Sequence, residues 1–97
     1  MNEHNKGCII RAKEILVELY HDDYKYCSEE DASQIFYIIQ LLDYLLLGTI
    51  PINSVVITNI MEEIITTSIY SSKPRLLKVL NILKGLEEDT NGSIRTT

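Results

Sequence analysis

The sequence predicts an all-α fold, an antiparallel four-helix bundle that ends in a flexible C-terminal tail. Apolar residues recur at intervals of three and four in four separate segments, which is the period of one face of an α-helix. The joins between these segments are short, and short joins make consecutive helices antiparallel. The chain has 97 residues, 45% of them hydrophobic, which is enough for one small domain with its own core. We assign that domain to residues 1–88 and the tail to residues 89–97.

The first helix is expected over about residues 5–21. Its apolar residues form a single stripe: Cys8, Ile9, Ala12, Ile15, Leu16, Leu19 and Tyr20. One such stripe is what a helix buries against a bundle core, and we expect Cys8 to be buried with it. The second cysteine, Cys27, follows the far end of this helix, roughly 20 Å from Cys8. An intrachain disulfide is therefore not expected.

The second helix is expected to follow Ser28 and to end at Leu47. Ser28 is a favourable N-cap, the next three residues are acidic, and Gly48 predicts a left-handed terminator. The apolar residues cover more than half of the helix circumference: Ala32, Ile35, Phe36, Ile38, Ile39, Leu41, Leu42, Leu45 and Leu46. A helix this apolar contacts two or more neighbours, so we expect it at the centre of the packing.

The third helix is expected over about residues 50–69, with Thr49 as the N-cap and Pro51 in the first turn. Helical spacing is clearest at Ile57, Ile60, Met61, Ile64, Ile65 and Ser68. Residues 50–58 are rich in β-branched side chains, so a strand is a rival interpretation there. We favour the helix because no second strand is near enough in sequence to pair with these residues.

The fourth helix is expected to begin where Ser72 precedes Pro74 and to end near Glu88. Its apolar face consists of Leu76, Leu77, Leu80, Leu83 and Leu86. Residues 89–97 are polar and have no periodicity, and we expect them to be mobile.

The charge balance and the apolar runs exclude several classes of protein. There are 14 acidic and nine basic residues, a net charge of −5, whereas nucleic-acid binders carry a basic stripe. The N-terminus has no signal-peptide pattern. The longest apolar run, residues 35–47, contains Gln40 and Asp43 and is too short to cross a bilayer. We therefore expect a cytoplasmic protein that does not bind nucleic acid.

No residue pattern indicates catalysis, a metal or a cofactor. His4 and His21 lie about a helix length apart. His21 and Cys27 are six residues apart and would supply only two of the three or four ligands that a zinc site needs. The sequence has no nucleophile motif such as G-x-S-x-G, and its four glycines are scattered rather than gathered in a phosphate loop. We expect a protein that is not an enzyme and needs no cofactor.

Two groups of residues are candidates for binding another protein. Lys73, Arg75 and Lys78 cluster at the start of the fourth helix, where the helix dipole disfavours positive charge, and Lys84 and Arg95 follow them. The alternative for this cluster is an ordinary solvated face.

Tyr37 and Tyr44 lie on one flank of the second helix. They belong either to an interaction surface or to the edge of the core, with their hydroxyls in water.

Three segments together resemble the immunity proteins of class IIa, pediocin-like bacteriocins: RAKEILVELY at residues 11–20, TIPINSVVITNIMEEIITTSI at 49–69 and RLLKVLNILKGL at 75–86. The resemblance implies a four-helix bundle that protects a bacteriocin producer from its own peptide. It further implies action from the cytoplasmic side, at the bacteriocin-occupied permease of the mannose phosphotransferase system. Specificity would then reside in the third and fourth helices and the tail, with Lys73, Arg75 and Lys78 as candidate contacts.

Two alternatives follow from the residues themselves. A small acidic helical inhibitor or regulatory protein, of phage origin for example, would bind a basic protein partner, because complementary charge speeds association. A homodimer would instead cover the apolar surface of the second helix.

Overall fold

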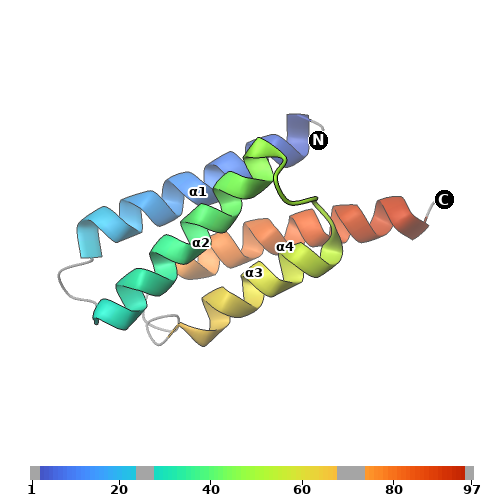
Figure 1. The fold of residues 1–97 in the computed structure, drawn as a ribbon. Coiled ribbons are helices and arrows are strands. Elements are labelled where there is room, and N and C mark those ends of the chain that lie inside the picture. The colour runs from blue at the N-terminus through green and yellow to red at the C-terminus, as the bar shows by residue number, and fades with distance from the viewer. Residues whose placement is uncertain (1–2, 24–27, 68–73, 96–97) are drawn as a thin grey trace.

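The computed structural model describes residues 3–23, 28–67 and 74–95, which form four α-helices and no strand. The helices are α1 (Glu3–Asp23), α2 (Glu29–Leu47), α3 (Ser54–Thr66) and α4 (Pro74–Arg95). Successive helices run in opposite directions, as Figure 1 shows, and both ends of the chain lie at the same end of the bundle. The predicted all-α, antiparallel four-helix fold is thus confirmed.

α1 extends two residues beyond each of its predicted ends. Five residues of the predicted stripe are buried: Ile9, Ala12, Ile15, Leu16 and Leu19. Cys8 and Tyr20 are only half-buried, contrary to expectation, because they lie at the two ends of the stripe, where less of the bundle covers them. Cys8 is a free thiol.

α2 begins and ends where its capping residues predict. The Ser28 hydroxyl accepts a hydrogen bond from the backbone N–H of Asp31 at 3.1 Å. At the other end Gly48 has φ 78°, and its N–H donates to the carbonyl of Leu45. A left-handed residue at this place lets the chain leave the helix while the last carbonyls keep hydrogen-bond donors.

The predicted central position of α2 is wrong, because the helices form a ring in which each has two neighbours. α1 packs closely on α2 and α4, and α4 packs on α3, whereas α2 and α3 pack less extensively on each other. The buried apolar residues of α2 are Ile35, Ile38, Ile39, Leu42 and Leu45. Phe36, which the apolar pattern places in the core, is 49% exposed, so two neighbours do not cover the whole apolar circumference of α2.

α3 begins four residues later than predicted, and Thr49 is not its cap. The Asn53 side chain caps it by accepting from the N–H of Val56 at 2.9 Å. A cap at Thr49 would require a helical Ile50 directly before Pro51, which proline disfavours. Instead the N–H groups of Thr49 and Ile50 donate to the carbonyl of Tyr44 and complete the end of α2.

α3 also ends earlier than predicted, at Thr66, because Thr67 is extended with φ −68° and ψ 129°. The last two residues of the predicted helix, 68 and 69, lie outside the described residues. Ile57, Ile60 and Ile64 are buried, as the helical spacing predicts, and the rival strand over residues 50–58 is wrong.

α4 starts at Pro74, as predicted, while Ser72 lies outside the described residues. Its helical backbone continues to Arg95, so the predicted end near Glu88 is too early. No proline follows Pro74, and each further residue adds one backbone hydrogen bond to an existing helix. The buried stripe is Leu76, Val79, Leu83 and Leu86, whereas Leu77 is exposed and Leu80 half-buried. The mobility of residues 89–97 stays a prediction.

Candidate protein-binding surface

The basic residues predicted to contact a partner do not form one compact site. Lys73 and the side chain of Arg95 lie outside the described part of the structure. Arg75 and Lys78 are three residues apart on α4 and are neighbours, whereas Lys84 lies six residues beyond Lys78 and is separated from it by about 120° around the helix axis. Lys78 and Lys84 are both exposed. The predicted contact residues that the structure describes on α4 therefore face at least two directions.

Arg75 has a structural role that the sequence did not predict. Its guanidinium Nη1 donates to Oδ2 of Asp22 at 2.7 Å, which joins the end of α1 to the start of α4. Both side chains are largely exposed, so water and salt weaken this attraction and its contribution to stability is small. Arg75 nevertheless already has an acidic neighbour within the bundle.

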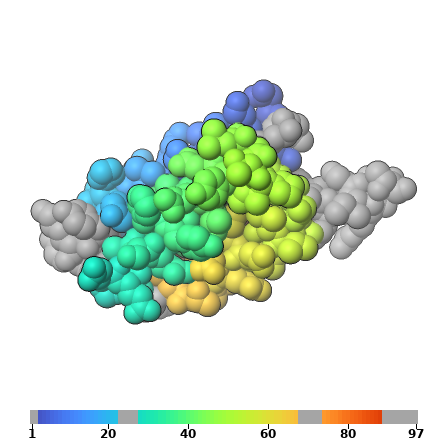
Figure 2. Space-filling view, viewed as in Figure 1, coloured from blue at the N-terminus to red at the C-terminus, as the bar shows by residue number. Residues whose placement is uncertain are grey.

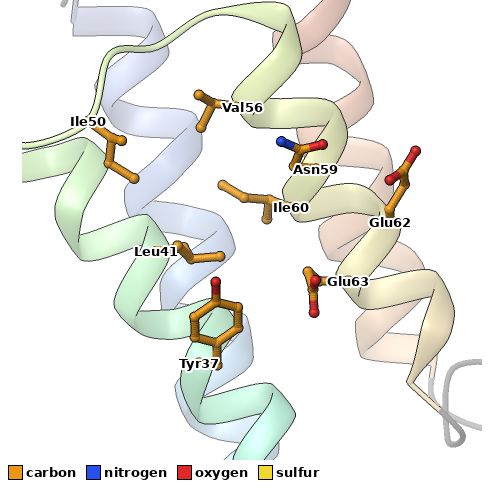
Figure 3. A pocket seen from close by; sticks show the side chains of 8 residues that line it. All are labelled: Tyr37, Leu41, Ile50, Val56, Asn59, Ile60, Glu62 and Glu63. Carbon is orange, nitrogen blue, oxygen red and sulfur yellow. The ribbon is translucent and has the colours of Figure 1, made fainter.

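A groove lies between α2 and α3, the two helices that pack least closely. Its cavity volume is about 350 Å³, at the lower end of the range for ligand pockets. Figure 3 shows Tyr37 and Leu41 on the α2 side, with Val56 and Ile60 on α3 opposite them and Ile50 at the far end. The lining is thus mainly apolar, and Tyr37 remains 47% exposed at the near end.

The rim of this groove is polar and acidic. Asn59, Glu62 and Glu63 of α3 line it, and the amide of Gln34 on α2 donates a hydrogen bond to the Glu63 carboxylate. Glu62 is exposed and makes no ion pair within the described part of the chain. The groove therefore offers apolar side chains beside a negative charge.

The two predicted surface tyrosines lie on this side of α2. Tyr37 and Tyr44 are 47% and 44% exposed, and with Leu41 they follow the i, i+4, i+7 spacing of one helix flank. Two further exposed apolar residues, Leu47 and Val55, stand on either side of the connection between α2 and α3. Figure 2 shows that α2 and α3 make up most of this side of the molecule.

The distribution of charge along the chain marks this surface, and sequence reasoning missed it. Residues 28–72 contain six acidic residues and no Lys, Arg or His. The rest of the chain holds all nine Lys and Arg residues together with eight acidic ones. The net charge of −5 therefore arises in the half of the bundle formed by α2 and α3. A count of acidic and basic residues in each predicted helix would have identified α2 and α3 as the acidic half.

Other kinds of site are not seen in the described residues. No three His, Cys, Asp or Glu side chains among them come together as metal ligands would. Within the same residues, each helix is too short or too polar to cross a membrane. The His4 ring nitrogen lies 3.8 Å from the Cys8 sulfur, one helical turn away.

Comparison of the chain with models of protein families, with curated protein sequences and with solved structures gave no match.

Proposed function

We propose that this chain is a bacteriocin immunity protein that acts by binding another protein. It would protect the producing cell from the cytoplasmic side, at the bacteriocin-occupied permease of the mannose phosphotransferase system. Support comes from the resemblance of residues 11–20, 49–69 and 75–86 to the pediocin-like immunity family. The antiparallel four-helix fold agrees with the architecture that this resemblance implies.

The observation that most favours a binding role is the surface formed by α2 and α3. It combines an apolar groove, an exposed aromatic ring at Tyr37 and an acidic rim at Glu62 and Glu63. Protein interfaces commonly combine apolar and aromatic residues at the centre with charged residues around them.

Survival of sensitive cells tests this proposal. The chain would be expressed in a bacteriocin-sensitive strain and challenged with a panel of pediocin-like peptides. We expect protection against one or a few of the peptides. Absence of protection against every peptide, with the protein present and folded in the cells, would contradict the immunity role.

The basic residues at the start of α4 can be tested in the same cells. Arg75 should be left intact because its ion pair with Asp22 joins two helices. The double variant Lys73→Glu and Lys78→Glu would then lose protection if these residues contact the partner. Full protection by that variant would remove them from the binding surface.

A second candidate function is inhibition or regulation of a basic protein. The absence of Lys, Arg and His from residues 28–72 favours it, because an acidic surface attracts a basic partner most strongly at low salt. Affinity capture from a host lysate at low and high salt tests this candidate. Recovery of only a membrane permease would contradict it, whereas a basic soluble protein released by salt would support it.

A further inference from the structure

We infer that the groove between α2 and α3 binds an amphipathic helix that carries Lys or Arg beside its apolar face. This inference rests on the proposed function only in that the protein works by binding, and it names the surface and the chemistry of the partner. The groove is the one lined by Tyr37, Leu41, Ile50, Val56, Asn59, Ile60, Glu62 and Glu63.

The shape of the groove favours a helix. Along α3 it extends from Val56 to Glu63, a separation of seven residues, which is about 10 Å or two helical turns. α2 and α3 run antiparallel beside it, so a further helix can lie between them as helices do when they complete a bundle (Figure 1). A peptide that binds by strand addition would need a free strand edge, and the described residues form no strand.

The lining of the groove specifies an apolar face on that helix. In Figure 3 the side chains of Leu41 and Ile60 point toward each other from the two helices. Tyr37 and Leu41 are four residues apart on α2, and Val56 and Ile60 are four apart on α3. Two parallel rows with this spacing match a partner with apolar residues at i, i+3 or i+4, and i+7.

The charge around the groove specifies basic residues beside that apolar face. Every charged residue of α2 and α3 is acidic. In Figure 3 Glu63 lies on the groove side of α3, and the exposed Glu62 lies at its outer edge with the carboxylate pointing away from α2. Lys or Arg on the partner would complement these carboxylates, and an acidic partner would be repelled. A second copy of this chain would present the same acidic face, so repulsion disfavours a dimer through this surface.

A second hollow on the molecule does not select a partner by charge. It lies on α1 and α2 and is lined by Ile10, Lys13, Glu14, Val17, Glu18 and Leu46. The Lys13 ammonium there is 2.5 Å from the Asp43 carboxylate, and acidic and basic residues are mixed. This hollow therefore supplies a control surface, in which Glu18 is an exposed carboxylate like Glu62.

The test is a titration of the purified full chain with a synthetic helical peptide of Leu and Lys, followed by NMR chemical shifts. We expect shift changes to gather on Tyr37, Leu41, Val56 and Ile60, and the affinity to fall as salt is added. Glu62→Lys should weaken binding about tenfold, whereas Glu18→Lys, with the same change in net charge, should weaken it about twofold or less.

Three results would overturn the inference: shift changes centred on α1 and α4, equal losses for the two variants, or a dimer in solution whose interface covers the groove. The titration uses purified protein, so it does not depend on whether cells are protected. Peptide binding at the groove without any protection would contradict immunity alone. Protection that Glu62→Lys and Tyr37→Ala leave intact, together with no peptide binding, would contradict the groove alone.

Discussion

The two halves of the bundle use charge in different ways. On the half formed by α1 and α4, acidic and basic residues are mixed, and an ion pair between Asp22 and Arg75 joins the two helices. On the half formed by α2 and α3, every charged residue is acidic, and among them Asp43 is paired with Lys13 of α1. Charges of the first half can neutralise each other within the molecule. No acidic residue of the second half has an opposite charge on α2 or α3, so the exposed ones can attract a partner.

The same two halves differ in how well they bury their apolar residues. Where α1 packs on its neighbours, residues such as Leu16 and Leu19 are almost fully buried. Hollows remain both between α1 and α2 and between α2 and α3, but six of the eight exposed large apolar residues in the described chain lie on α2 and α3, among them Leu47 at 76%. Tight packing serves stability, whereas we propose that the apolar groove left open serves binding.

The largest expected difference is between truncations on the two sides. Leu16→Ala removes a fully buried side chain and should lower the free energy of unfolding by about 2–5 kcal/mol. Val56→Ala removes a half-buried groove residue and should cost about 1 kcal/mol. Urea denaturation of both variants gives the comparison. Equal losses would mean that the groove is packed as closely as the rest of the core.

Two glycines should respond to alanine in opposite directions. Gly48 has φ 78° at the end of α2, so Gly48→Ala should destabilise the protein by about 1–2 kcal/mol. Gly85 lies within α4, and a methyl group added there would meet no other atom within 4 Å, so Gly85→Ala should stabilise by about 0.5–1 kcal/mol. Thermal melts of the two variants measure this contrast. A higher melting temperature for Gly48→Ala would contradict the left-handed end of α2, and a lower one for Gly85→Ala would contradict the open space at Gly85.

The start of α3 can be tested by substituting its observed N-cap, Asn53, and its predicted N-cap, Thr49. Asn53→Ala removes the acceptor for the N–H of Val56 and should cost about 1 kcal/mol. Thr49→Ala should change stability by less than about 0.5 kcal/mol, because Thr49 is an exposed residue that does not cap the helix. Chemical denaturation measures both. The reverse order would restore the earlier helix start.

The smallest expected effect belongs to the ion pair between α1 and α4. A double-mutant cycle with Asp22→Ala and Arg75→Ala should give a coupling of about 0.2–1 kcal/mol, since both side chains are largely exposed. The coupling should shrink further in high salt. A coupling that exceeds this range and does not respond to salt would mean that the pair is far better shielded from water than its exposure indicates.

Local signals predicted most of the fold. Ser28 and Gly48 indicate both ends of α2, because a hydroxyl cap and a left-handed glycine act through neighbouring backbone groups alone. The start of α3 was missed because two start signals compete there. Thr49 with Pro51 resembles a helix start, yet the backbone of Thr49 is used by the end of α2, which leaves Asn53 as the cap.

The candidate binding surface was only partly predictable. The sequence predicted Tyr37 and Tyr44 on one flank of α2, either in an interaction surface or at the edge of the core. It also shows that residues 28–72 contain no basic residue. The groove itself could not be predicted, because its existence depends on how closely α2 and α3 approach in the assembled bundle. Similarly, no local pattern near Arg75 indicates its ion pair with Asp22, 53 residues earlier in the chain.

We propose that the α2–α3 surface is the part of the molecule that performs the function. The most direct test of this claim is survival of bacteriocin-challenged cells that express either Glu62→Lys or Glu18→Lys at equal levels, beside cells with the unchanged protein. We predict that Glu62→Lys loses protection while Glu18→Lys keeps it. Of these two residues, Glu62 lines the groove and Glu18 lines the other hollow. Protection that survives Glu62→Lys, or that both variants lose equally, would contradict the claim.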